Sequence, residues 1–358
     1  MSEDTVKQIL ADIDDYTNTA FAMIGLANLY RFDDEAKTFR ANARFYQGRR
    51  FDTSPDNRRS PSNTVRPDLA IVVPGETAAL VEVKMSLPKD RELWQRVSEQ
   101  LEGYDDDLIG WPTSDGRVHS HDIALIVHQT RVAVVEMIEG MRATGQLQIE
   151  RPVYALSFIR SDQREAFFLF RLESGEPSFR PVRRRLEEPV SVPAEVLAVH
   201  YTKFKLWDTR PPVPYLMDLI WREVVADRAA GHDRFPTLRR NSRLPIELNV
   251  AEVAEYLQSN FSFHQSLGEH PELTERERQP SIPRIEWVRQ ALDCFTETEL
   301  WRWLGNGRDR CEIDYQKAKL DIEEFARRYL STGSGSEEYG GQANLFGPTD
   351  AEGISPSA

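Results

Sequence analysis

The sequence of 358 residues contains few cysteines and no long apolar segment. The two cysteines, Cys294 and Cys311, are too few for a disulfide scaffold or a cysteine-rich zinc site, and they favour a reducing compartment. No run approaches the roughly 18 apolar residues of a membrane span, and the first ten residues lack the apolar core of a signal peptide. We therefore expect a cytoplasmic protein without an integral membrane segment.

Basic residues are also in deficit. Lysine and arginine number 45 against 58 aspartates and glutamates, which gives a formal net charge of −13. This balance argues against a nonspecific nucleic-acid coat, although an enzyme with a local basic groove is still compatible with it. Such a local excess exists between Arg40 and Arg66, where seven arginines accompany two aspartates.

The pattern of apolar residues predicts two domains and a tail. In residues 1–185, helical patterns alternate with short apolar runs typical of strands, which indicates a mixed α/β layered core. The helical patterns cover residues 3–30, 88–108 and 132–143, and the strand-like runs cover residues 69–73, 78–83, 122–128, 153–159 and 166–172.

The pattern changes after the arginine triplet at 183–185. Residues 186–330 predict a mainly helical accessory domain, for which a winged-helix arrangement is one alternative. Its clearest helices lie at 215–225, 250–257 and 285–295, with Asn249 as an expected N-cap, and the helical pattern continues at 298–304 and 315–330. Residues 331–358 begin with a Gly/Ser-rich stretch at 331–341 and predict a flexible tail.

One predicted hairpin carries a group of charged residues. Two apolar runs flank Gly75, and Asp68 and Glu82 each lie seven residues from that glycine. An antiparallel register centred on Gly75 places the two carboxylates opposite one another, with Cβ atoms about 4.5–5.5 Å apart. Lys84 shares a face with Glu82 because side chains alternate along a strand.

Like charges directly opposite destabilise a sheet unless something neutralises them. Mg²⁺ or Mn²⁺ would do so, because hard cations take carboxylate oxygens together with water and substrate phosphate. A metal activates water near neutral pH, and Lys84 would orient that water or stabilise the phosphate oxyanion. The structural alternative is a same-face ion pair of Glu82 and Lys84 on an edge strand.

The following helical stripe adds two polar residues four positions apart, Gln100 and Tyr104. A glutamine at the edge of a core-facing stripe needs polar partners. We expect those partners to be the charged site or a nucleic-acid strand beside it.

These residues resemble the PD-(D/E)xK nuclease superfamily. The match consists of Pro67-Asp68, a spacer of 13 residues and Glu82-Val83-Lys84. Gln100 and Tyr104 also resemble the QxxxY motif of the RecB-type and CRISPR-adaptation-type exonuclease branch. The resemblance covers roughly residues 38–128 and implies a restriction-endonuclease-like mixed sheet.

The resemblance also implies roles for single residues. Asp68 and Glu82 would bind metal, Lys84 would be catalytic, and Gln100 and Tyr104 would contact substrate or support the site. The family often adds an acidic residue or a histidine on its first helix. Glu35 is the candidate for that third ligand, with Asp33 and Asp34 as alternatives.

Five arginines lie in or beside the loop that enters the Asp68 strand. They would contact DNA phosphates beside the metal, whereas the alternative is an ordinary solvated loop. These residues are Arg49, Arg50, Arg58, Arg59 and Arg66.

The tail contains a short apolar motif. Residues 342–346 are similar to the QxxLF-type peptide by which bacterial replication and repair proteins bind the sliding clamp. Leu345 and Phe346 would be apolar anchors, and Gln342 would supply amide hydrogen bonds. A chance apolar dipeptide, or one that docks back on the protein, is the alternative.

Two functions are consistent with these features. The first is a Mg²⁺-dependent deoxyribonuclease of DNA repair, restriction or phage defence, tethered to the sliding clamp by its tail. The second is a catalytically silent α/β module that recruits a protein partner through its acidic helical domain and tail.

Overall fold

The computed structural model divides the chain into two compact units. The sheet unit comprises Asp15–Thr209 and Gln258–Ile282, and the accessory unit comprises Met1–Asp14, Arg210–Leu257 and Pro283–Ala358. The residues that the structure describes are 3–33, 38–39, 43–53, 64–73, 75, 77–84, 91–113, 118, 120–161, 167–193, 210–233, 235, 243–261, 284–296, 301–305, 307–315 and 320–343.

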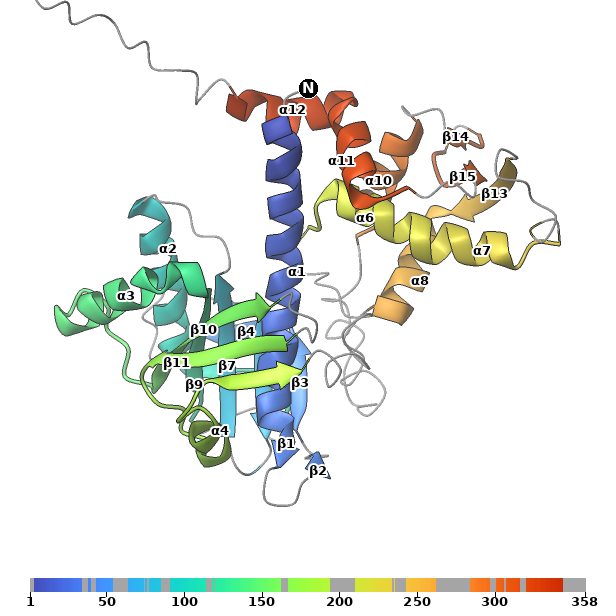
Figure 1. Cartoon of the computed structure of the whole chain (residues 1–358). Helices are drawn as coiled ribbons and strands as arrows, with labels where there is room; N and C mark the ends of the chain where they lie inside the picture. The colour runs from blue at the N-terminus through green and yellow to red at the C-terminus, as the bar shows by residue number, and fades with distance from the viewer. Residues whose placement is uncertain are drawn as a thin grey trace, which may run out of the picture. The chain divides into compact units, whose positions relative to one another are not determined.

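A mixed seven-stranded sheet forms the centre of the sheet unit, which confirms the predicted α/β class (Figure 1). The strand order is β12-β11-β10-β9-β7-β6-β3, and only β7–β9 and β9–β10 are parallel pairs. The strands are β3 (Arg44–Gln47), β6 (Leu69–Val73), β7 (Thr77–Lys84), β9 (Asp122–His128), β10 (Val153–Ser161), β11 (Phe167–Ser174) and β12 (Val190–Pro193).

The hairpin of β6 and β7 has the register that the sequence predicts. Its first and last pairs are Val73 with Thr77 and Leu69 with Val81, so the pairing is centred on Gly75. Gly75 itself has a φ of +77°, a backbone conformation that glycine adopts without strain. Asp68 and Glu82 are therefore the next positions beyond the last ladder pair.

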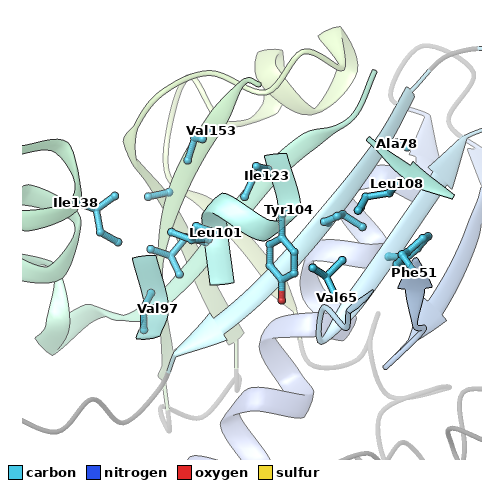
Figure 2. Packing of buried hydrophobic residues seen from close by; sticks show 14 of the residues in the cluster. Phe51, Val65, Ala78, Val97, Leu101, Tyr104, Leu108, Ile123, Ile138 and Val153 are labelled. Atoms are coloured by element: carbon cyan, nitrogen blue, oxygen red, sulfur yellow. The ribbon is translucent and has the colours of Figure 1, made fainter. Parts of the chain in front are cut away.

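Helices cover both faces of this sheet. On one face, α2 (Arg91–Asp105) and α3 (Ala133–Ala143) contribute apolar residues to a buried cluster with β7, β9 and β10 (Figure 2). The other face carries the C-terminal part of α1 (Glu3–Arg31), where the hydroxyls of Tyr30 and Tyr154 lie 3.0 Å apart. A Cβ at Gly25 would lie 2.5 Å from the Phe170 ring, so helix and sheet are in close contact there.

Short elements complete the sheet unit. They are β1 (Phe32–Asp33) paired with β2 (Thr38–Phe39), a small sheet of β4 (Phe51–Thr53), β5 (Thr64–Val65) and β8 (Leu108–Ile109), the 3₁₀ turn η2 (Gln129–Arg131) and α4 (Arg180–Arg185).

The sheet extends beyond the predicted domain boundary at residue 185. Strand β12 pairs with β11 from Phe167↔Pro193 to Phe170↔Val190 and forms the edge of the sheet. Its single proline, Pro193, ends the strand, as an edge position tolerates. Residues 190–193, just after the predicted boundary, therefore belong to the sheet of the first predicted domain.

The accessory unit combines helices with a small antiparallel sheet of order β13-β15-β14. Asn249 is confirmed as an N-cap, because its Oδ1 accepts the amide N–H of Ala251 at 2.9 Å. The elements are α6 (Val213–Leu219), the π-helix η3 (Ile220–Val225), α7 (Ala226–Ala230), β13 (Leu244–Asn249), α8 (Val250–Phe261), α10 (Ile285–Thr296), β14 (Trp301–Trp303), β15 (Arg310–Tyr315), α11 (Ile322–Leu330) and α12 (Gly333–Ala343).

Two predictions for this unit are wrong. Helical structure was expected at 298–304, but Trp301–Trp303 form a strand in which buried Trp301 alternates with exposed Arg302. The winged-helix alternative stays a prediction.

The second wrong prediction is the flexible linker at 331–341. Most of this Gly/Ser-rich stretch lies in α12. Tyr339 is buried in this helix, and its hydroxyl donates to Asp12 at 2.9 Å. A Cβ at Gly335 would lie 2.0 Å from the Tyr329 carbonyl oxygen, so glycine allows a close approach to α11. None of the helices that the structure describes is long and apolar enough to span a bilayer.

Two glycines of the sheet unit with similar backbone conformations give a matched test of how closely the chain packs against β10. Gly175 has a φ of +68°, and a Cβ there would lie 2.0 Å from the Val153 carbonyl oxygen. Gly145 has a φ of +72° with nothing within 4 Å of such a Cβ. We expect Gly145→Ala to cost about 1 kcal/mol of unfolding free energy and Gly175→Ala about 3 kcal/mol or more, measured by urea unfolding. Equal losses would contradict the close contact at Gly175.

Candidate functional site

The charged residues of the hairpin gather at the carboxyl end of β7. Asp68 is half-buried, Glu82 is 1% exposed, and the Lys84 side chain is 23% exposed. Strands β7, β9 and β10 run parallel, so their carboxyl ends meet at one edge of the sheet. In open α/β sheets this edge is where ligands bind.

Lys84 contacts Glu82 directly, and Asp68 contacts the backbone between them. Lys84 Nζ donates to Glu82 Oε1 in an ion pair, and Asp68 Oδ2 accepts the Val83 amide N–H at 2.8 Å. Glu82 is part of the segment 82–84 at the end of β7, and Asp68, which precedes β6, binds the backbone of the same segment.

Helix α2 brings the predicted Gln100 and Tyr104 to the same place. Tyr104 is fully buried within the apolar cluster (Figure 2), and its hydroxyl donates to Glu82 Oε2 at 2.5 Å. Gln100 Nε2 donates to the Tyr104 hydroxyl oxygen at 2.9 Å. Each oxygen of the Glu82 carboxylate thus has a side-chain partner.

The electrostatic environment keeps Lys84 charged and Tyr104 protonated. Burial acts to lower the pKa of Lys84, but the carboxylates of Glu82 and Asp68 outweigh it and raise this pKa. The pKa of Tyr104 is raised well above its usual value by burial and then by the same two carboxylates. At neutral pH both side chains are hydrogen-bond donors to Glu82.

The predicted phosphate-contacting arginines differ in their surroundings. Arg49 is 8% exposed, and its Nε and Nη2 both donate to the Gly110 carbonyl oxygen, at 3.0 and 2.7 Å. Its guanidinium also lies over the Tyr46 ring at 5.2 Å. Arg49 therefore contributes to packing within the sheet unit, and its predicted contact with phosphate stays a prediction.

Arg50 and Arg66 are exposed, and Arg66 Nε donates to the Gly48 carbonyl oxygen at 2.7 Å. Several other predicted residues lie outside the described part of the chain. These are Glu35, Asp34, Arg58, Arg59, Leu345 and Phe346, and for Gln342 and Asp33 only the backbone is described.

The donor atoms at the site suit a hard divalent cation. Asp68 and Glu82 offer carboxylate oxygens, the ligands that Mg²⁺ and Mn²⁺ prefer. Among the described residues, no group of three or more histidines, cysteines, aspartates and glutamates could hold a metal ion. The two carboxylates fit a metal that keeps several water ligands, as Mg²⁺ usually does.

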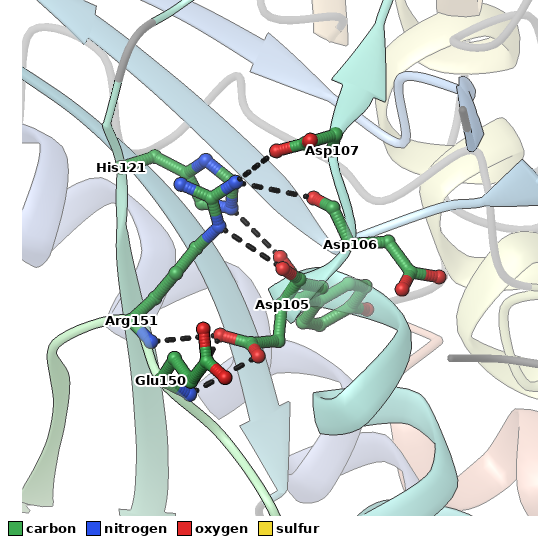
Figure 3. A network of polar contacts seen from close by, with 7 residues as sticks. Asp105, Asp106, Asp107, His121, Glu150 and Arg151 are labelled. Carbon is green, nitrogen blue, oxygen red and sulfur yellow. Dashed lines mark hydrogen bonds and ion pairs between the residues drawn. The ribbon is translucent and has the colours of Figure 1, made fainter. Parts of the chain in front are cut away.

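A second polar group at the end of α2 was missed by sequence reasoning (Figure 3). His121 is buried, and its Nε2 donates to the Tyr104 carbonyl oxygen at 2.7 Å. Burial, and then the charge of Arg151, lower the His121 pKa to about 3, so the ring is neutral. The run Asp105–Asp107 directly after Tyr104 was the available signal.

Comparisons with family models, with curated proteins and with solved structures find no match to this chain.

Removal of the Lys84 charge tests the electrostatics of the site. Lys84→Met leaves Glu82 buried beside Asp68 without a counter-charge, so we expect a loss of about 3 kcal/mol of unfolding free energy at pH 7. Because the folded pKa is raised, the advantage of wild type is full below the ordinary pKa of 10.5 and is lost as pH rises through the folded pKa.

Urea unfolding between pH 7 and pH 11.5 measures this difference. Lys7→Met is the matched control, because the Lys7 side chain is 71% exposed and its partner Asp4 is 91% exposed. Wild-type stability in Lys84→Met, or a gap that widens above pH 10.5, would contradict the assignment.

Proposed function

We propose that the protein is a metal-dependent nuclease that hydrolyses phosphodiester bonds of DNA. The observation that carries this proposal is the group at the carboxyl end of β7, where buried Glu82 contacts Lys84 and lies beside Asp68 in the hairpin register. The resemblance of these residues to the PD-(D/E)xK motif supports the same reaction. DNA repair, restriction and phage defence are all compatible with such an activity.

The charges favour a divalent cation as cofactor. Two carboxylates and one ammonium leave a local charge of −1, so Asp68 and Glu82 retain negative charge for Mg²⁺ or Mn²⁺. When bound, the metal supplies Lewis-acid activation of water and neutralises phosphate charge.

The protein's own side chains then orient the reactants. The Lys84 ammonium has three donor protons, enough to hold a water molecule or a phosphate oxygen as well as Glu82. Tyr104 keeps one Glu82 oxygen in place, and Gln100 in turn holds the Tyr104 hydroxyl. In the proposed reaction Lys84 stabilises the negative charge that develops on the phosphate.

Cleavage of plasmid and linear DNA with Mg²⁺ or Mn²⁺ tests the proposal. We expect Asp68→Asn, Glu82→Gln and Lys84→Met each to lower the cleavage rate about 100-fold or more, because each removes charge from the reacting centre. Chelation of the metal should abolish cleavage by the wild type.

Two control variants change the same residue types elsewhere. Glu136→Gln alters an exposed carboxylate of α3, and Lys7→Met alters an exposed lysine of α1, and both should cleave at the wild-type rate. Circular dichroism establishes that the site variants fold. Equal rates in wild type and all site variants, or no cleavage by any folded protein, would refute the nuclease.

Recruitment of a protein partner through the tail is the second candidate function. Helix α12 holds the start of the tail in place, because Tyr339 is buried and bonded to Asp12. The motif at 342–346 begins in the last turn of this helix, which would present Leu345 and Phe346 a few residues from an anchored point. A catalytically silent module would use this contact alone, and a nuclease would gain local concentration on DNA from it.

A pull-down with bacterial sliding clamp tests this tether. We expect Leu345→Ala/Phe346→Ala to reduce capture at least tenfold, because the two apolar anchors are lost. Pro348→Ala/Thr349→Ala changes two neighbouring tail residues and should be captured like the wild type. Undiminished capture of the Leu345/Phe346 variant, or no capture of wild type, would eliminate the motif as a clamp ligand.

A further inference from the structure

Donors from His121 and Arg151 bind the carbonyl groups at the C-terminal end of α2 (Figure 3). The last carbonyl groups of a helix have no partner within the helix and need donors from elsewhere. His121 supplies one donor to the Tyr104 carbonyl oxygen at 2.7 Å. Arg151 supplies the next two, from Nε to the Asp105 carbonyl oxygen at 3.2 Å and from Nη2 to that of Asp106 at 3.4 Å.

The end of α2 also accepts hydrogen bonds through a side chain, from the backbone that precedes β10. The Asp105 carboxylate accepts the amide N–H of Arg151 at 2.7 Å and that of Glu150 at 3.0 Å. The Arg151 guanidinium also pairs with the Asp107 carboxylate at 3.0 Å. The Arg151 side chain is 15% exposed and that of Asp107 is 57% exposed, so solvent reaches the pair with Asp107 more than it reaches the contacts to the helix carbonyl groups.

This network connects α2 to the strands beside the candidate site. His121 directly precedes β9, and Arg151 lies two residues before β10. Strand β9 is the parallel neighbour of β7, which carries Glu82. The network therefore sets where the last turn of α2 lies along the part of the sheet that holds the carboxylate.

Tyr104 is in that last turn and makes the contact that the network would control. Its hydroxyl lies 2.5 Å from Glu82 Oε2, and such a bond is sensitive to displacements of about 0.5 Å. Gln100, which holds the hydroxyl from the other side, lies one turn earlier in the helix. A shift at the end of α2 would thus move Tyr104 before any other residue of the site.

We propose that Arg151 is a positioning residue for DNA hydrolysis, which orients Glu82 through the end of α2 and the Tyr104 hydroxyl. The importance of Glu82 in this role rests on the proposed function. Asp105 and His121 are the other members of this hydrogen-bond network. The Asp105 carboxylate fixes the Arg151 backbone, and the neutral His121 ring donates to the Tyr104 carbonyl oxygen without adding a charge beside Arg151.

The primary experiment measures the Tyr104 hydrogen bond without any catalysis. The chain is labelled with ¹³C at the hydroxyl-bearing carbon of its 11 tyrosines, and the Tyr104 resonance is assigned by its loss in Tyr104→Phe. In Arg151→Met we expect this resonance to move toward that of a solvent-exposed tyrosine. Arg142→Met, which alters a partly buried arginine that pairs with Glu139 on α3, should leave it in place.

The second experiment asks whether Arg151 acts through Tyr104. With DNA substrate, Arg151→Met should lower kcat about tenfold or more and leave KM within about twofold, because the site is misaligned but the phosphate contacts are unchanged. In the Tyr104→Phe background the same substitution should have little further effect on kcat. Arg151→Lys keeps the charge and should therefore recover part of the loss in kcat. If Arg151→Met does not fold, Arg151→Lys replaces it in both experiments.

An unmoved Tyr104 resonance in Arg151→Met would overturn the proposal. An undiminished effect of Arg151→Met on kcat in the Tyr104→Phe background would also overturn it, because Arg151 would then act by another route. If the wild type cleaves no DNA, the nuclease proposal fails, whereas the resonance still decides whether Arg151 positions Tyr104.

Discussion

Burial of one carboxylate, that of Glu82, is the constraint on which the arrangement of the site depends. A carboxylate that is 1% exposed is costly unless each oxygen has a partner and its charge is balanced. Lys84 satisfies one oxygen from the same strand, and Tyr104 satisfies the other from a helix 22 residues later. The apolar cluster of Figure 2 excludes water around these contacts, and the low dielectric strengthens them. The position of α2 on the sheet is therefore a matter of charge as well as of packing.

The same constraint explains why the site needs both an antiparallel hairpin and parallel neighbours. The hairpin returns the chain so that Asp68 follows the last ladder pair, where its carboxylate accepts the Val83 amide. The parallel crossover to β9 places α2 over the face of Glu82 and ends it beside residues that precede β9 and β10. An antiparallel neighbour in place of β9 would need no helix between the strands, and Tyr104 would then have no element to carry it.

The sequence predicted those parts of the fold that depend on local patterns. The register about Gly75 follows from two apolar runs of known spacing, and the pairing of Gln100 with Tyr104 follows from the helical period. Their place beside Glu82 was expected from the need for polar partners and from the resemblance to the QxxxY motif. Contacts between distant residues could not be read in this way. The Arg49 guanidinium binds a carbonyl group 61 residues away in the sequence, and Tyr339 of α12 binds Asp12, which is 327 residues away. Composition contains no information about such contacts, and it suggested a basic loop and a flexible linker instead.

The arginines of this chain differ in whether a carboxylate neutralises their charge, which decides whether they could contact a nucleic acid. In the accessory unit, α10 and the β14–β15 hairpin carry four arginines that each lie within 4 Å of a carboxylate; these are Arg289, Arg302, Arg308 and Arg310. Such paired side chains give that surface no excess positive charge for a phosphate backbone. Arg66, by contrast, is exposed, is held through Nε by the Gly48 carbonyl oxygen, and lies two residues before Asp68. If the protein is the nuclease proposed above, a DNA strand that contacts Arg66 would pass close to the carboxylates.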